Sequence, residues 1–225
     1  LKNFLEVKCL RLKVKAVIFD IDGTLYKSEK YLRHLVNEII QTISELLSMP
    51  RSDAEKTFRL LRSRFGSVVL GLGEMGVDRR EFYSALLQRL DPREFIDPRP
   101  DVAELLKKLK EKGCKIAFHT NSSRRLAEMV LEALGIDPAL PDILMTCDEA
   151  EPKPMLDGYL KILKALKLKS EEVLYVGDRW RVEVEPAKKL GMKTALVSSR
   201  PEGDPDLVIG DVSELVGKVE CLGET

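Results

Sequence analysis

The sequence has no long apolar run and no net charge. Its longest wholly apolar stretches, such as residues 16–19, are about four residues long, whereas a helix that crosses a bilayer needs about 20. The 37 basic and 37 acidic residues balance to a formal charge of zero, so no long-range field favours nucleic acid or an anionic membrane. We therefore expect neither a nucleic-acid nor a membrane partner.

Cysteine is scarce, and residues 1–13 do not have the pattern of a secretory signal. Residues 1–13 are basic but lack the apolar block of about 7 to 15 residues that such a signal contains, so we interpret them as an N-terminal extension. The four cysteines show no CxxC or Cys/His spacing that could close a zinc site: they are Cys9, Cys114, Cys147 and Cys221. We predict reduced thiols in a cytoplasmic protein.

Asparagine and glutamine are also rare, while charged residues reach 33% of the chain, above the usual proportion of about 25%. This combination favours a thermophilic source. A length of 225 residues with 44% apolar residues excludes global disorder and suits one core with a smaller appendage.

Short β-rich runs alternate with helix-period stretches from residue 14 onward, which is typical of a parallel sheet with helices on both faces. Strands are predicted at these positions: 14–19, 114–119, 143–145, 173–176 and 194–197. Three of the intervening helices end before a glycine that suits the left-handed position after a helix, namely Gly113, Gly135 and Gly191. The fold class is therefore α/β, with a Rossmann-like core.

Almost a hundred residues separate the first two predicted strands, more than a simple crossover needs. Apolar residues recur there at helical spacing. We predict a small helical cap domain over residues 27–96, inserted into a core domain made of residues 14–26 and 97–225.

The strongest chemical signal is the segment DIDGTL at residues 20–25, directly after the first strand. Asp20 and Asp22 would lie at the carboxyl end of that strand, where open α/β sheets bind ligands. Removing two carboxylates from water is costly without a cation, so the two residues predict a Mg²⁺ site.

Three later segments bring matching groups to the same edge. Thr120 and Asn121 follow the second strand and suit phosphate oxygens, and Lys153 stands between two prolines as a fixed positive charge. Asp178 follows the strand at 173–176, with Glu183 five residues further on, a spacing that suits metal binding directly and through water.

With these four segments in this order, the sequence resembles the haloacid dehalogenase superfamily, in particular its phosphatases with a helical cap, such as phosphoglycolate phosphatase and pyrimidine 5′-nucleotidase relatives. The resemblance implies Mg²⁺-dependent hydrolysis of a small phosphomonoester, with Asp20 as nucleophile and Asp22 as general acid and base. It further implies phosphate binding by Thr120 and Lys153. Asp178 would bind the metal together with the Asp20 carboxylate and the backbone carbonyl of Asp22.

The resemblance leaves some points open. Glu183 stands where many members have Asp, so we expect it to reach the metal through water, and Asn121 would steady the nucleophile loop or the substrate. The substrate class stays undecided between a nucleotide, phosphoglycolate and a sugar phosphate, and so does the choice between monomer and homodimer. A phosphosugar mutase of the same family is an alternative, because it would use the same two aspartates.

The motif GxGxxG at residues 71–76 suggests a second alternative, a non-catalytic nucleotide-binding module. Its surroundings are helical in period and no second strand follows, so we predict a flexible cap loop instead. Arg64 and Ser67 next to it are candidates for substrate selection. His34 and His119, the two histidines, are expected to be structural.

Overall fold

The computed structural model describes residues 11–200 and 202–223. Its centre is an all-parallel sheet of six strands in the order β4-β3-β2-β5-β6-β7. The strands are β2 (Ala16–Phe19), β3 (Lys115–His119), β4 (Ile143–Met145), β5 (Val173–Gly177), β6 (Lys193–Val197) and β7 (Leu207–Ile209). The chain adds β3 and β4 on one side of β2 and β5 to β7 on the other, so the carboxyl end of β2 lies at the topological switch point, where such sheets bind ligands.

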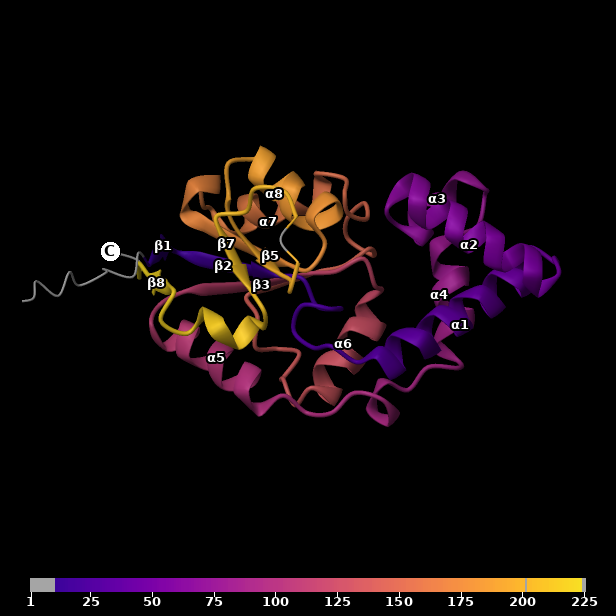
Figure 1. Cartoon of the computed structure of the whole chain (residues 1–225), viewed down its shortest axis with the longest axis horizontal. Helices are drawn as coiled ribbons and strands as arrows, with labels where there is room; N and C mark the ends of the chain where they lie inside the picture. Colours follow the sequence, from indigo (N-terminus) through magenta and orange to yellow (C-terminus); the bar gives the residue numbers. More distant parts are fainter. Residues whose placement is uncertain (1–10, 201, 224–225) are drawn as a thin grey trace, which may run out of the picture.

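Helices cover both faces of this sheet (Figure 1). The first face packs against α5 (Pro100–Glu111) and α6 (Arg124–Ala133), and the second against α7 (Asp157–Leu166) and α8 (Glu185–Lys189). Short helical turns complete the described part: η1 (Pro92–Glu94), η2 (Ser170–Glu172), η3 (Trp180–Val184) and η4 (Val212–Leu215). The predicted α/β class with a parallel sheet is confirmed.

Glycines end helices where the sequence predicted. Gly113, Gly135 and Gly191 have φ values of 84°, 74° and 85°, a left-handed conformation that costs glycine little and other residues more. Each glycine lets the chain turn back toward the sheet. The strands predicted at 114–119, 143–145, 173–176 and 194–197 are all present, with ends that move by at most one residue.

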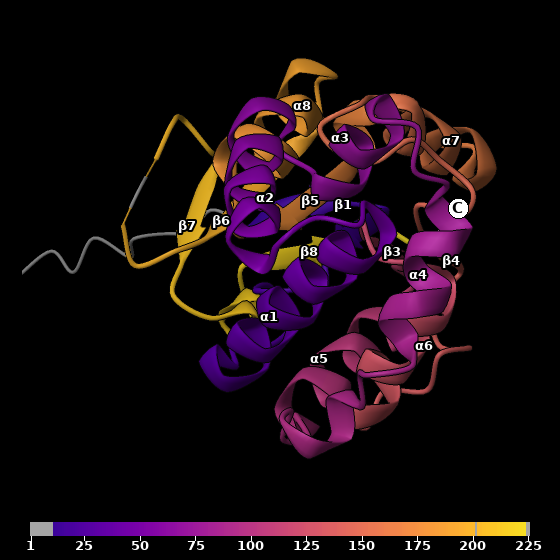
Figure 2. The same ribbon diagram turned by 90° about the vertical axis from the view of Figure 1, so that its right-hand side faces the viewer.

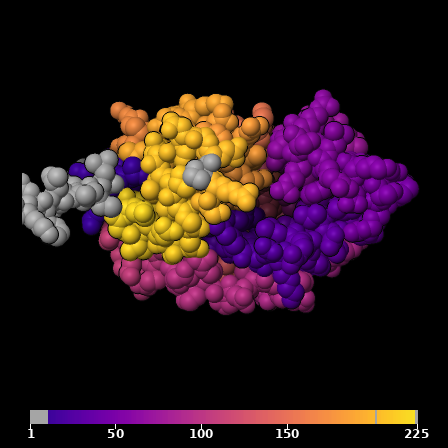
Figure 3. Space-filling model, viewed as in Figure 1, coloured from indigo at the N-terminus to yellow at the C-terminus, as the bar shows by residue number. Residues whose placement is uncertain are grey.

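Four helices form a separate lobe beyond the carboxyl ends of the strands (Figures 1 and 3). They are α1 (Glu29–Leu46), α2 (Arg51–Phe65), α3 (Val68–Glu74) and α4 (Arg79–Leu87), and they share their own apolar core. Figure 2 shows the lobe from its outer side, with α1 and α2 in front of the sheet. We call this lobe the cap.

The prediction of a flexible loop at residues 71–76 is wrong, because most of these residues belong to the helix α3. A Cβ at Gly71 would lie 2.7 Å from Leu61 Cδ2 and 2.9 Å from Phe65 Cδ2. The missing side chain thus lets α3 pack closely on α2. Gly76, at φ 82°, belongs to the turn after the helix. Since these glycines serve helix packing and a turn, they do not form the phosphate-binding loop on which the nucleotide-binding alternative depended.

The strand predicted over residues 14–19 is divided in two. β1 (Leu12–Val14) leaves the main sheet and pairs in parallel with β8 (Val219–Cys221). The paired strand therefore begins within the predicted extension, of which residues 1–10, including Cys9, lie outside the described residues. No helix in the described ranges is long and apolar enough to cross a membrane.

The prediction that the cysteines are reduced thiols is wrong for two of them. Cys114 and Cys221 form a disulfide across a sequence separation of 107 residues, while Cys147 is a buried free thiol. Cys114 lies between α5 and β3, and β8 carries Cys221 to it. The sequence alone does not predict this disulfide, because the pairing depends on how β8 returns to the core.

We expect Cys221→Ser to lower the free energy of unfolding by about 2–5 kcal/mol, because the disulfide restricts a long loop in the unfolded chain. Denaturant titrations with and without a thiol reductant measure this. Cys147→Ala is the control, since it keeps the disulfide and should remain sensitive to the reductant. A wild-type midpoint that does not change on reduction would contradict the prediction.

Candidate active site

Asp20 lies one residue beyond β2 and is 2% exposed. Its Oδ1 accepts a hydrogen bond of 2.6 Å from Lys153 Nζ, and its Oδ2 accepts one of 2.9 Å from Thr24 Oγ1. Lys153 itself is fully buried. The carboxylate is thereby fixed in orientation, with a buried positive charge against it.

The loop between β4 and α7 brings Lys153 to this position. Besides Asp20, its Nζ donates to the carbonyl oxygen of His119 at 2.8 Å. Asn121 holds the backbone of Lys153, since its Nδ2 donates to the Lys153 carbonyl at 2.9 Å and its Oδ1 accepts from the Lys153 amide at 2.7 Å. Both polar atoms of Asn121 are therefore engaged with the lysine loop, and its predicted contact with phosphate stays a prediction.

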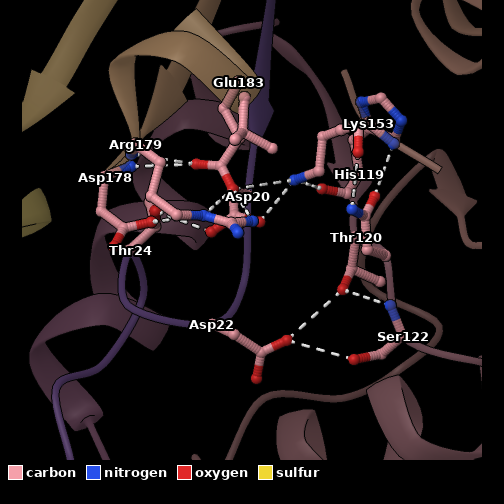
Figure 4. A network of polar contacts seen from close by, with 12 residues as sticks. Asp20, Asp22, Thr24, His119, Thr120, Ser122, Lys153, Asp178, Arg179 and Glu183 are labelled. Atoms are coloured by element: carbon pink, nitrogen blue, oxygen red, sulfur yellow. Dashed lines mark hydrogen bonds and ion pairs between the residues drawn. The ribbon is translucent and has the colours of Figure 1, made fainter. Parts of the chain in front are cut away.

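Asp22 points away from Asp20 (Figure 4). Its Oδ1 accepts a 2.6 Å hydrogen bond from Tyr26, and its Oδ2 lies 3.4 Å from Thr120 Oγ1 and 3.3 Å from Ser122 Oγ. The Ser122 amide in turn donates to Thr120 Oγ1 at 3.0 Å. The two aspartates of the motif thus have different surroundings, one beside a lysine and the other among hydroxyl groups.

Asp178 follows β5 and meets Asp20 and Glu183 in an acidic cluster, in which one oxygen from each residue lies within 4.8 Å of the others. Gly23 makes this approach possible. Its φ is +96°, and a Cβ there would lie 2.5 Å from Asp178 Oδ2. The glycine of the motif is therefore needed for its backbone conformation and for the space that Asp178 occupies.

Two cations face these three carboxylates. Glu183, which is fully buried, contacts the Arg179 guanidinium and lies 3.5 Å from Lys153 Nζ. Burial alone would raise the pKa of Glu183, but Arg179 and Lys153 lower it to about 2. Burial followed by repulsion from Glu183 raises the pKa of Asp178 to about 8 and that of Asp20 to about 6. The cluster lacks one positive charge.

The residues fit a hard divalent cation. Oδ1 of Asp178 is buried without a hydrogen-bond partner among the described residues, and Arg179 Nε lies 4.0 Å from it. An unpartnered carboxylate oxygen inside an acidic cluster is an unusual and costly arrangement, and oxygen donors of this kind are what Mg²⁺ prefers. Asp20 and Asp178 could hold the ion, with Glu183 beside them.

Sequence reasoning missed Arg179 and Ser122. Arg179 Nε donates to Glu183 Oε1 at 2.9 Å, and Figure 4 shows the guanidinium beside Asp20. Arg179 stands directly after Asp178 and four residues before Glu183, and this spacing could have predicted its contact with Glu183. Ser122 was visible as part of the segment after β3, but its contact with Asp22 depends on how two loops meet.

A cavity of about 180 Å³ lies between the cap and the core, beside this network. Of the two residues proposed for substrate selection, Ser67 lines it, whereas Arg64 is exposed and stacks on Phe65. The arginine that lines the cavity is Arg62, two residues earlier. Two positions along α2 thus separate the candidate from the arginine that the structure places at the cavity.

The histidines have structural contacts, as the sequence suggested. His119 is 2% exposed and packs edge-on against Tyr159, with ring centroids 4.6 Å apart. Gly158 permits this packing, because a Cβ there would lie 2.4 Å from His119 Nε2. Burial keeps the pKa of His119 well below its usual value. His34 stacks on Phe95 in the connection between cap and core.

Comparison with known proteins gives the family. The model of the haloacid dehalogenase-like hydrolases matches residues 14–191, most of the chain and all four segments of the site. The chain belongs to this family. The resemblance noted in the sequence is confirmed for this hydrolase.

Relatives and solved structures agree. The hydrolase is 26% identical, over 93% of its chain and 98% of the relative, to a glyceraldehyde 3-phosphate phosphatase of Methanocaldococcus jannaschii. It is 29% identical, over 95% and 98% of the two chains, to a putative pyrophosphatase PpaX of Caldanaerobacter subterraneus. A crystal structure of a phosphatase from Thermococcus onnurineus superposes with a TM-score of 0.69 at 24% identity, covering 92% of this chain and all of that one, and supports the fold.

We expect Mg²⁺ to bind this hydrolase more tightly as the pH rises from 6 to 8. With its pKa near 8, Asp178 is mostly protonated below that pH in the metal-free protein, and the proton must leave before the carboxylate can bind a metal. The apparent affinity should fall by up to about tenfold for each pH unit below 8. Isothermal titration calorimetry in buffers of different ionisation enthalpy measures both affinity and proton release.

Asp178→Asn should abolish this binding, and Asp53→Asn on α2, an exposed acid outside the cluster, is the matched control. An affinity that does not change with pH, or Mg²⁺ binding that survives Asp178→Asn, would contradict the assignment of the cation to this cluster.

Proposed function

We propose that the protein is a Mg²⁺-dependent phosphomonoesterase that transfers the phosphoryl group of a small phosphorylated metabolite to Asp20 and then to water. The single observation that carries the proposal is the contrast between the two motif carboxylates. Asp20 is held by Lys153 and Thr24 in a buried cluster, whereas Asp22 turns toward Thr120 and Ser122. This contrast supports a role in attack for Asp20 and a role in proton transfer for Asp22.

In the first step, an oxygen of Asp20 attacks phosphorus as the ester P–O bond breaks, which yields an aspartyl phosphate and an alkoxide. Asp22 gives its proton to that alkoxide. Lys153 lies against Asp20 and would neutralise a phosphoryl oxygen, and Thr120 would donate a hydrogen bond to another. Their fixed positions lower the barrier, because little reorganisation is needed when charge develops.

In the second step, Asp22 removes a proton from water as that water attacks phosphorus, and the P–O bond to Asp20 breaks. Inorganic phosphate leaves, Asp20 is again a free carboxylate, and the proton taken from water restores the protonated Asp22 with which the cycle began. Mg²⁺, when bound at Asp20 and Asp178, would neutralise charge so that an anionic nucleophile can approach an anionic phosphate. The names of the relatives, a glyceraldehyde 3-phosphate phosphatase and a putative pyrophosphatase, support phosphoryl transfer to water.

We expect release of inorganic phosphate from a panel of small phosphomonoesters, including p-nitrophenyl phosphate, only when both Mg²⁺ and Asp20 are present. Asp20→Asn should lower kcat by at least about 1,000-fold, because no covalent intermediate can form. Asp148→Asn, at an exposed acid between β4 and α7, is the matched control. Conversion of a phosphosugar into its isomer without phosphate release would instead indicate the mutase.

Asp22→Asn should separate the two steps. With p-nitrophenyl phosphate the leaving group needs no protonation, so the first step should survive, while activation of water is lost and turnover falls by about 100- to 10,000-fold. Rapid mixing should then show a burst of about one equivalent of p-nitrophenol with slow phosphate release. Equal loss of burst and turnover would place Asp22 in binding or positioning rather than in proton transfer.

A further inference from the structure

The cavity between cap and core has two chemically different walls. The core supplies polar residues from the loops that carry Thr120 and Asp178, and the cap supplies mostly apolar ones. The core residues are Asn121, Ser122 and Arg179, and the cap residues are Leu32, Leu35, Val36, Ile39, Phe58, Arg62, Gly66, Ser67, Val68, Val69 and Tyr83.

The cap wall offers a ligand few hydrogen-bonding groups besides Arg62 and the Ser67 hydroxyl. Ser67 Oγ already accepts from the Leu70 amide at 3.3 Å, and the Tyr83 hydroxyl donates to the Asn121 carbonyl at 2.7 Å. Arg62 is an exposed residue of α2, so its stem can cover the apolar wall while its charged end remains in water. Seven aliphatic or aromatic side chains and Gly66 make up the rest of the wall.

The cavity lies where the alcohol part of a substrate must extend. A phosphoryl group beside Asp20 would direct its ester oxygen toward Asp22, which Ser122 contacts at 3.3 Å, and Ser122 lines the cavity. Hydroxyl groups of a sugar would be buried against aliphatic side chains with few partners, which is unfavourable. An apolar group of the same size would gain from leaving water.

Building on the proposed phosphomonoesterase activity, we propose that the preferred substrates are phosphomonoesters of compact, largely apolar alcohols. The cavity volume of about 180 Å³ gives room for a compact group, since an apolar cavity of roughly 150 Å³ holds a benzene-sized molecule. An alcohol of about five or six carbon atoms fits this space. A nucleoside would extend beyond this space into solvent, and a polyhydroxylated chain would find few hydrogen-bond partners on the cap wall.

The test compares 3-methylbutyl phosphate with glycerol 3-phosphate. Both are primary esters with five non-hydrogen atoms beyond the ester oxygen. The two alcohols therefore have the same size and differ in polarity. We expect kcat/KM for 3-methylbutyl phosphate to be at least about tenfold higher, the discrimination that a change of this kind gives in an apolar pocket. Titration of both esters into Asp20→Asn protein should show the same preference in binding, without turnover.

Val36→Thr and Val69→Thr add a hydroxyl to the cap wall at nearly constant shape. Each should lower kcat/KM for 3-methylbutyl phosphate by about fivefold and change that for glycerol 3-phosphate by less than twofold. The matched control is Val208→Thr on β7, which is 38% exposed and outside the cavity, and it should alter neither value.

Two results would overturn the proposal. Equal or better hydrolysis of glycerol 3-phosphate would show that the cap wall does not select apolar groups. Preference for 3-phosphoglycerate, lost in Arg62→Gln, would show that Arg62 binds an anionic group instead. Failure of the proposed function is distinct from both, because then p-nitrophenyl phosphate would release no phosphate either.

Discussion

The balance of buried charge beside β2 is the constraint on which the rest of the site depends. Three carboxylates, Asp20, Asp178 and Glu183, share a volume with the cations Lys153 and Arg179. With all three carboxylates ionised, one negative charge would be in excess, and burial followed by repulsion from Glu183 raises the pKa of Asp178 to about 8, so that this residue holds a proton at neutral pH. A divalent cation would change the excess from one negative to one positive charge, and a positive site attracts a phosphate dianion. The residues whose buried charge is costly without a cation therefore make the site suitable for phosphoryl transfer.

The parallel sheet explains why so much of this site could be predicted. Residues that follow different parallel strands emerge at one edge, so Asp20, Thr120 and Asp178 could be grouped from their positions alone, and Lys153 from the loop after β4. The structure brings all four together. Arg179 was not predicted, since the pattern shows where a residue stands but not whether its side chain turns toward Glu183. The disulfide between Cys114 and Cys221 was missed for a related reason: it depends on the return of β8 to β1.

Two patterns in the cap illustrate a limit of short motifs. The GxGxxG spacing suggested a loop, but Gly71 serves the close packing of α3 on α2. A glycine in a helix costs about 1 kcal/mol relative to alanine, and it is tolerated here because Leu61 and Phe65 occupy the space that a methyl group would fill. The helices themselves followed from apolar periodicity, which reports on burial directly. The orientation of these helices over the sheet could not be predicted from the sequence, because it depends on contacts such as the hydrogen bond from Tyr83 to Asn121.

That contact also links the apolar cap to the charged core. Tyr83 binds the carbonyl of Asn121, and Asn121 holds both polar groups of the Lys153 backbone. Arg79, at the start of α4, contacts the carbonyls of Cys147 and Ala150 and forms a 3.1 Å ion pair with Glu151, just before Lys153 in the chain. The cap is therefore joined to the segments that position Asp20's lysine. An apolar wall beside the loops of Asn121 and Arg179 would exclude water and strengthen the electrostatic interactions of the site. Recognition of the alcohol and stabilisation of the phosphoryl group would then depend on the same arrangement of cap and core.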